Sequence, residues 1–145
     1  MSGVWVVIEQ REGRIARISL EAVAAAQGLL KKAAPVLKSV AKTVSAIVVG
    51  APAGPAGGQL ASLGLEKIVS IEHPLLAHYT ADGYTLALQQ FFAQEQPEYV
   101  IFPHTYQVRD YAPALAARLG QVLISDVVAI SDGPVFTRQL MQGRL

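Results

Sequence analysis

The stretch from Tyr99 to Gly120 reads YVIFPHTYQVRDYAPALAARLG and contains one complete strand–helix unit. Tyr99 to Phe102 is a short apolar run closed by Pro103, which predicts a strand that ends there. The residues that follow are rich in alanine, leucine and arginine, which favour a helix. Gly120 directly follows Leu119 and predicts the end of that helix. The residues of this unit that we expect in the core are Val100, Ile101, Leu115 and Leu119.

The same order of strand and helix occurs repeatedly before residue 99. Apolar runs predict earlier strands at Val4 to Ile8, Val44 to Val49 and Lys67 to Ile71. Between them we expect a helix capped by Ser19 and ended near Ala34 by Pro35, a short helix from Gln59 to Leu63, and a helix capped by Thr80 or Asp82 that runs to about Gln96. Further expected elements are a helical turn at Val36 to Ala41 and strands within Val122 to Ile130 and from Val135 to Leu140.

This alternation predicts the fold class. It is typical of a three-layer α/β domain with a mainly parallel open sheet and helices on both faces. Ligands of such sheets bind beyond the carboxyl ends of the strands. The expected strand ends are at Gln10, Gly50 to Gly58, Glu72 to His73 and Pro103 to Asp110.

Composition excludes several classes of function. The 145 residues are 52% hydrophobic and 16% charged, which indicates one globular domain rather than a disordered chain. A net charge of +1 argues against strong electrostatic binding of nucleic acid. The chain has no cysteine, which excludes disulfides and thiol catalysis. We see no targeting segment and no apolar run of roughly 20 residues, so we expect a cytoplasmic bacterial protein that does not enter the membrane.

The glycine-rich segment from Gly50 to Gly58 is the first candidate for a binding site. It lies between an expected strand and an expected helix, where backbone N–H groups can hold a phosphate. It lacks the GxGxxG pattern and is not followed by Gly-Lys-Ser/Thr. Pro52 and Pro55 also remove two N–H donors. We therefore expect an ordinary flexible loop, with weak or no binding of AMP and ATP.

The side chains that carry most enzyme chemistry are present but form no recognised motif. The histidines His73, His78 and His104 lack metal-ligand spacing, so we expect them to be structural or solvated. There is no GxSxG sequence, and nothing in the spacing of Asp110 and Asp126 indicates an acid–base pair. An enzyme with His104 and Asp110 at the strand edge is the weakest of the functional hypotheses. The sequence predicts neither a catalytic site nor a metal site.

The order of several short motifs points to a family. A strand ending in Pro103 is followed by Thr105, by Arg109-Asp110 and by Ala112-Pro113 at the start of an Ala/Leu/Arg-rich helix. Later matches are Ser125-Asp126 and Phe136-Thr137-Arg138, and earlier ones are Glu9, Gly13 and Ser19-Leu20-Glu21. This pattern resembles the N-terminal domain of the electron transfer flavoprotein alpha subunit. The chain departs from the family pattern at Val108, where glycine is usual, and after Arg138.

The resemblance implies a fold and a function. The fold is Rossmann-like, of the adenine nucleotide alpha hydrolase-like kind. The function is that of an FAD-containing carrier that moves electrons from flavin dehydrogenases, such as acyl-CoA dehydrogenases, to the respiratory chain through a membrane quinone oxidoreductase. The implied partner is a beta subunit of related fold, which in the family binds AMP. Residues 1–145 then form a single structural and interfacial domain, and the FAD-binding C-terminal domain of the family is absent from this chain, which alone should not retain FAD.

The resemblance singles out charged residues for contact with the partner subunit or with the flavin domain: Arg109, Asp110 and Arg138. The alternative for them is helix capping by Asp110 and ordinary surface ion pairs. For the whole chain, the alternative is a free-standing nucleotide-binding α/β domain resembling universal stress proteins. Those proteins carry a glycine-spaced phosphate loop late in the chain, and neither Asp132-Gly133-Pro134 nor Gln142-Gly143-Arg144 provides it.

Overall fold

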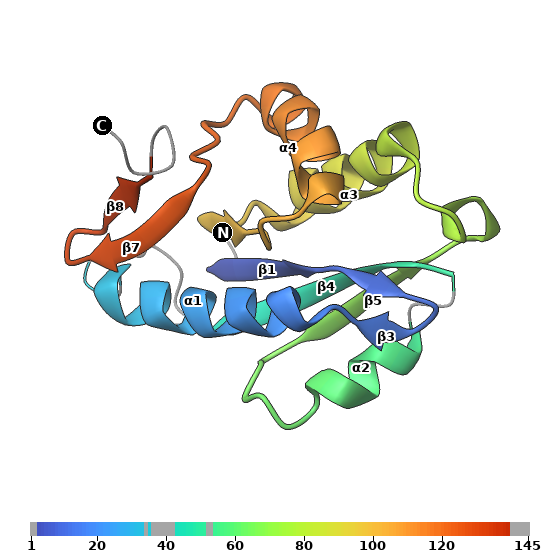
Figure 1. Ribbon diagram of the computed structural model, residues 1–145, viewed down its shortest axis with the longest axis horizontal. Coiled ribbons are helices and arrows are strands. Elements are labelled where there is room, and N and C mark those ends of the chain that lie inside the picture. Colours follow the sequence, from blue (N-terminus) through green and yellow to red (C-terminus); the bar gives the residue numbers. More distant parts are fainter. Residues whose placement is uncertain (1–2, 34, 36–42, 52–53, 140–145) are drawn as a thin grey trace.

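The computed structural model describes residues 3–33, 35, 43–51 and 54–139 (Figure 1). The first half of the chain contains β1 (Val4–Ile8), β2 (Gln10–Arg11), β3 (Arg14–Ile15), α1 (Arg17–Ala33), β4 (Val44–Gly50) and α2 (Gly54–Leu60). The second half contains β5 (Ile68–Glu72), the 3₁₀ helix η1 (Pro74–Leu76), α3 (Ala81–Glu95), β6 (Tyr99–Ile101), α4 (Tyr106–Leu119), β7 (Val127–Ser131) and β8 (Val135–Arg138). Among the described residues, no helix has both the length and the apolarity that a membrane crossing requires.

A parallel sheet with the strand order β5-β4-β1-β6 forms the centre of the domain. The register places Val6 of β1 beside Ala46 of β4 on one side and Ile101 of β6 on the other. Helices α1 and α2 cover one face, and α3 and α4 cover the other (Figure 1). The predicted three-layer α/β fold is therefore confirmed.

Each central strand contributes side chains to two separate cores. Val4, Val6 and Ile8 pack under α1, whereas Trp5 and Val7 pack under α3 and α4. Strand β4 alternates in the same way. Because helices cover both faces of the sheet, these strands are continuous apolar runs in the sequence and do not alternate between apolar and polar residues.

One of the four residues predicted for the core of the strand–helix unit is fully buried, and the other three pack against the cores while partly buried. Leu115 is fully buried, as expected, in the core under α3 and α4. Val100, Ile101 and Leu119 are only partly buried. Val100 and Ile101 belong to β6, which is an edge strand of the sheet and has one neighbour instead of two.

Helix α1 begins earlier than the sequence predicts. It starts at Arg17, so Ser19 lies inside its first turn and is not the N-cap. The Ser19 side chain is buried and accepts a hydrogen bond from Glu9 N at 2.8 Å, while its own hydroxyl donates to Glu9 O at 3.3 Å. The Ser19 hydroxyl thus forms hydrogen bonds with the backbone at the end of β1 instead of capping the start of the helix. The predicted end is confirmed, since α1 stops at Ala33, shortly before Pro35.

The glycine-rich segment is largely helical, which corrects the prediction of a loop. Helix α2 covers Gly54–Leu60, whereas the sequence predicts a helix at 59–63. Pro55 is compatible with this position because the first helical turn needs no N–H donor there. Pro52 and the expected turn at 36–41 lie outside the described residues.

The caps of the last two long helices follow from the sequence. Thr80 caps α3 by accepting from Gly83 N, and Thr105 caps α4 by accepting from Val108 N at 3.1 Å. Gly120 ends α4 in the left-handed conformation with φ of 65°. The Thr80 alternative for α3 and the Gly120 stop are thus confirmed.

The last two strands form a separate antiparallel hairpin instead of extending the sheet. Val127 pairs with Arg138 and Ser131 with Val135. The hairpin lies against the C-terminal half of α1 (Figure 1). Phe136 packs on Tyr99 of β6, with ring centroids 6.4 Å apart.

Candidate functional site

The carboxyl edge of the sheet is the place where a fold of this order binds ligands. The chain moves from β1 to β4 on one side and later returns to β6 on the other, so the strand order reverses between β1 and β6. Open α/β sheets bind their ligands in the crevice beyond this switch point. Glu9 follows β1, and Thr105 follows β6 by a few residues.

A hydrogen bond spans this switch point. Thr105 Oγ1 donates to Glu9 Oε1 at 2.8 Å, although the two residues are 96 positions apart. Glu9 is only half-buried, but its backbone N–H and C=O are both held by Ser19. A carboxylate held by hydrogen bonds therefore stands at the edge where open α/β sheets bind their ligands. Like charges repel, so this edge disfavours a phosphate.

The Gln10 side chain forms hydrogen bonds at the neighbouring part of the edge. Its Nε2 donates to Val49 O at 3.0 Å, and its Oε1 accepts from Gly13 N at 2.7 Å. Gln59 of α2 supports the same turn, since its Nε2 donates to Gly13 O at 2.8 Å. Helix α2, which begins inside the glycine-rich segment, thus contacts the β2–β3 turn through Gln59.

Three tyrosines pack beside Glu9. The ring centroids of Tyr79 and Tyr84 are 5.0 Å apart, and each ring lies within 6.2 Å of Tyr111. Burial raises the pKa of Tyr111 and of Tyr84, and the Glu9 carboxylate raises both further. Burial and the hydrogen bond to Asp110 raise the pKa of Tyr79. All three are therefore neutral hydrogen-bond donors near pH 7 and cannot act as bases there.

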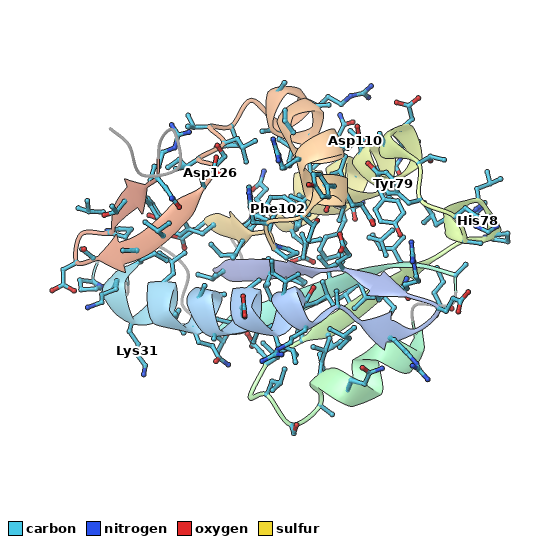
Figure 2. The ribbon with its side chains drawn as sticks, in the orientation of Figure 1. Lys31, His78, Tyr79, Phe102, Asp110 and Asp126 are labelled. Carbon is cyan, nitrogen blue, oxygen red and sulfur yellow. The ribbon has the colours of Figure 1, made fainter. Side chains whose placement is uncertain are left out.

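Asp110 does not cap helix α4, which corrects the capping alternative. The N-cap is Thr105, and Asp110 lies one turn further along the helix. Its Oδ2 accepts a hydrogen bond from the Tyr79 hydroxyl at 2.7 Å (Figure 2). Asp110 therefore ties α4 to the segment that precedes α3.

Arg109 is exposed, as are the other two members of the predicted charged set, Asp110 and Arg138. Its guanidinium carbon lies 6.0 Å from the centroid of the Tyr106 ring, within the range of a cation–π contact. Tyr106 is 88% exposed, which is unusual for a large aromatic side chain. Among the described residues, Arg109 forms no ion pair.

Arg138 lies apart from Arg109 and Asp110, on the hairpin. Its Nε donates to Ser125 O at 2.8 Å, and one terminal nitrogen donates to Ser125 Oγ at 3.2 Å. The predicted set therefore divides into two places, one on α4 and one on β8. Figure 2 likewise shows Asp126 beside the hairpin, away from Asp110.

Two of the three histidines, His73 and His104, have structural contacts, and His78 is exposed. His73 caps η1 by accepting from Leu75 N at 3.1 Å. His104 Nε2 lies 3.3 Å from Asp126 Oδ1, and both side chains are half-exposed. The structure thus pairs His104 with Asp126 rather than with Asp110. Within the described part of the chain, no three metal-ligating side chains come together.

Sequence reasoning predicted a site at the carboxyl edge of the sheet but not the hydrogen bond that spans it. Glu9 and Thr105 each follow a strand, and this position is the signal that could have singled them out. The tyrosine cluster carries no such signal, because its members come from α3, from α4 and from the segment before α3.

The fold and this edge define a Rossmann-like α/β domain in which a Thr105–Glu9 hydrogen bond spans the switch point. The family model of the electron transfer flavoprotein domain matches residues 4–145. The chain therefore belongs to the electron transfer flavoprotein family, as its motifs indicated.

The relatives specify the subunit type. The chain is 34% identical over 144 residues to the electron transfer flavoprotein subunit alpha of Bacillus subtilis (strain 168), covering 97% of this chain and 42% of that protein. It is 31% identical over 142 residues to the alpha subunit of Clostridium acetobutylicum, covering 98% and 40%. It is also 29% identical over 123 residues to the acryloyl-CoA reductase electron transfer subunit beta of Anaerotignum propionicum, covering 85% and 32%. The similarity favours the flavoprotein hypothesis over the universal-stress alternative, and the chain spans about two fifths of the length of the two alpha subunits.

Proposed function

We propose that residues 1–145 are the structural and interaction domain of an FAD-containing electron carrier of the alpha-subunit type. The observation that carries the proposal is the Glu9–Thr105 hydrogen bond at the switch point. A domain with a carboxylate at the edge where such sheets bind ligands is suited to support a cofactor held elsewhere. Membership of the electron transfer flavoprotein family supplies the identity of the cofactor.

In this proposal, the flavin is bound by a C-terminal domain outside residues 1–145. The match covers 42% of the Bacillus subtilis relative, so more than half of that protein lies outside it. The complete protein pairs with a beta subunit, accepts electrons from flavin dehydrogenases and passes them to a membrane quinone oxidoreductase. Residues 1–145 carry out no reaction of their own, and the protein acts in the cytoplasm.

We assign contact with the partner subunit or the flavin domain to Arg109, Asp110 and Arg138. Arg109 is the strongest of these, because its guanidinium lies over the ring of an exposed tyrosine, whereas Asp110 and Arg138 form hydrogen bonds within the domain. Tyrosine and arginine are the side chains most enriched among interface residues with large binding energies. Asp110 and Arg138 already form hydrogen bonds within the domain, so their proposed role is to hold the contact surface in place.

Arg109→Ala tests this assignment in the complete flavoprotein. We expect the affinity between the subunits, or the retention of flavin, to fall by about tenfold, which corresponds to about 1.4 kcal/mol. The melting temperature of the isolated domain should hardly change, since an exposed cation contributes little to folding.

Arg118→Ala is the matched control for Arg109→Ala. Arg118 is exposed on the same helix, and its side chain donates to Gln89 at 3.4 Å. The control should keep the parent affinity and flavin content. If both arginine variants bind partner and flavin like the parent, Arg109 has no role in the contact.

A further inference from the structure

Three exposed arginines surround the turn between β2 and β3. Arg11 ends β2, Arg14 begins β3 and Arg17 begins α1. The turn follows β1, so it lies beyond the carboxyl end of that strand, at the opposite end of the molecule from β7 and β8 (Figure 1). Among the residues that the structure describes, no carboxylate forms an ion pair with any of the three. We call these three residues the arginine patch.

The positions of these arginines are unfavourable for folding. In the antiparallel pairing of β2 with β3, Arg11 lies directly opposite Arg14. Like charges at opposite positions repel each other and destabilise the ribbon. Arg17 lies in the first turn of α1, where the helix dipole favours acidic side chains. Residues that break local preferences in this way are expected at functional sites.

Other side chains hold the turn in place. Gln10 Oε1 accepts from Gly13 N at 2.7 Å, and Gln59 Nε2 donates to Gly13 O at 2.8 Å. Glu12 and Gly13 have φ angles of 52° and 82°, the left-handed conformation of a tight hairpin turn. The arginine side chains take no part in these hydrogen bonds. The backbone that carries them is therefore fixed, while the guanidinium groups remain available to a partner.

We propose that the arginine patch is a docking surface for an acidic segment of a partner protein. A guanidinium group forms paired hydrogen bonds with a carboxylate, which a lysine ammonium cannot do. Residues opposite each other in a ribbon have Cβ atoms about 5 Å apart. Arg11 and Arg14 can therefore bind two carboxylates of one segment. This inference goes beyond the proposed function and does not depend on the flavin.

The surroundings of the patch disfavour other anions. A small phosphate is held by backbone donors, but Gly13 N and Ile15 N already donate to glutamine side chains. Nucleic acid needs more cations and aromatic side chains for stacking, whereas the net charge is +1 and residues 10–17 contain no aromatic residue. Anionic membranes bind clusters of about four to eight basic residues. An acidic protein segment fits the patch best.

Titration of a hexaglutamate peptide into the 145-residue protein tests the proposal. At low salt, the amide chemical shifts should change most at residues 10–17. The double variant with Arg11→Gln and Arg14→Gln should bind the peptide about tenfold more weakly, because it loses two exposed charge pairs. Salt at about 0.5 M should abolish the difference, since it screens exposed charges.

Lys67→Gln combined with Arg118→Gln is the matched control. Both side chains are exposed, and the pair removes the same charge outside the arginine patch. The control should bind hexaglutamate like the parent. The proposal is overturned if the control loses as much affinity as the patch variant, or if the parent does not bind the peptide. Tighter binding of oligothymidylate, phosphatidylserine vesicles or inorganic phosphate at the patch also overturns it.

Thermal unfolding shows whether the arginines serve folding instead. The Arg11→Gln, Arg14→Gln variant should melt about 1–3 °C above the parent, because it removes the repulsion between two opposite cations. A lower melting temperature would mean that these arginines stabilise the domain, which contradicts a surface kept for a partner. None of these measurements involves flavin, so the proposed electron-carrier function is tested separately.

Discussion

Replacing Leu115 with alanine should lower the free energy of unfolding by about 2–5 kcal/mol. Leu115 is 2% exposed and lies in the core between the sheet and helices α3 and α4. Truncation removes buried apolar surface and leaves a cavity that rigid neighbours such as Tyr111 fill only in part. Denaturant unfolding of the parent and the variant measures the change directly.

Leu86→Ala is the control for Leu115→Ala. Both are leucines in long helices of the same layer, but Leu86 is largely exposed. Its replacement should change stability by less than about 0.5 kcal/mol, as surface substitutions usually do. A cost for Leu115→Ala below about half a kcal/mol would contradict the packing of α4 described above.

Thr105→Val should cost about 1–3 kcal/mol of stability. The hydroxyl of Thr105 accepts from Val108 N as the cap of α4 and donates to Glu9 Oε1. Valine has almost the same shape, so the change removes the two hydrogen bonds without opening a cavity. Loss of a cap costs about 0.5–2 kcal/mol, and a part-buried carboxylate that loses its donor adds to that.

Thr105→Ser is the matched variant, because serine keeps the hydroxyl group. It should retain most of the parent stability in the same denaturant experiment. If the valine and serine variants are equally stable, the hydroxyl group does not hold the edge of the sheet together.

Much of the fold could be predicted because its signals are local. The strands Val4–Ile8 and Val44–Gly50 are covered by helices on both faces. A strand buried on both faces has apolar residues at consecutive positions, so it appears in the sequence as a continuous apolar run. Thr80 and Gly120 have the side-chain and backbone chemistry that helix ends need. These features depend on a few neighbouring residues, so a single sequence contains them.

The wrong predictions concern residues whose partners are distant in the chain. Ser19 is a good N-cap by type, but the end of β1 takes its hydroxyl group. Asp110 is close enough to a helix start to suggest capping, but Tyr79 takes its carboxylate. In both cases a tertiary hydrogen bond outweighs the local preference, and the sequence gives no sign of the competition.

The candidate site was predictable only as a region. Strand order and strand ends place it at the carboxyl edge, since parallel strands all finish on the same side. The pairing of Glu9 with Thr105 depends on β1 and β6 being neighbours in the sheet. The two strands are neighbours because of the sheet topology, and no spacing of residues along the chain indicates this.

Titration of FAD and AMP into the purified chain, followed by dialysis, is the most direct test of the proposed function. Because the Glu9 carboxylate stands at the switch point, we expect the protein to emerge colourless, without flavin absorbance. Calorimetry should show no binding of AMP in the micromolar range. Stoichiometric yellow protein, or micromolar AMP binding that competes with FAD, would contradict the account of a supporting domain that holds no nucleotide itself.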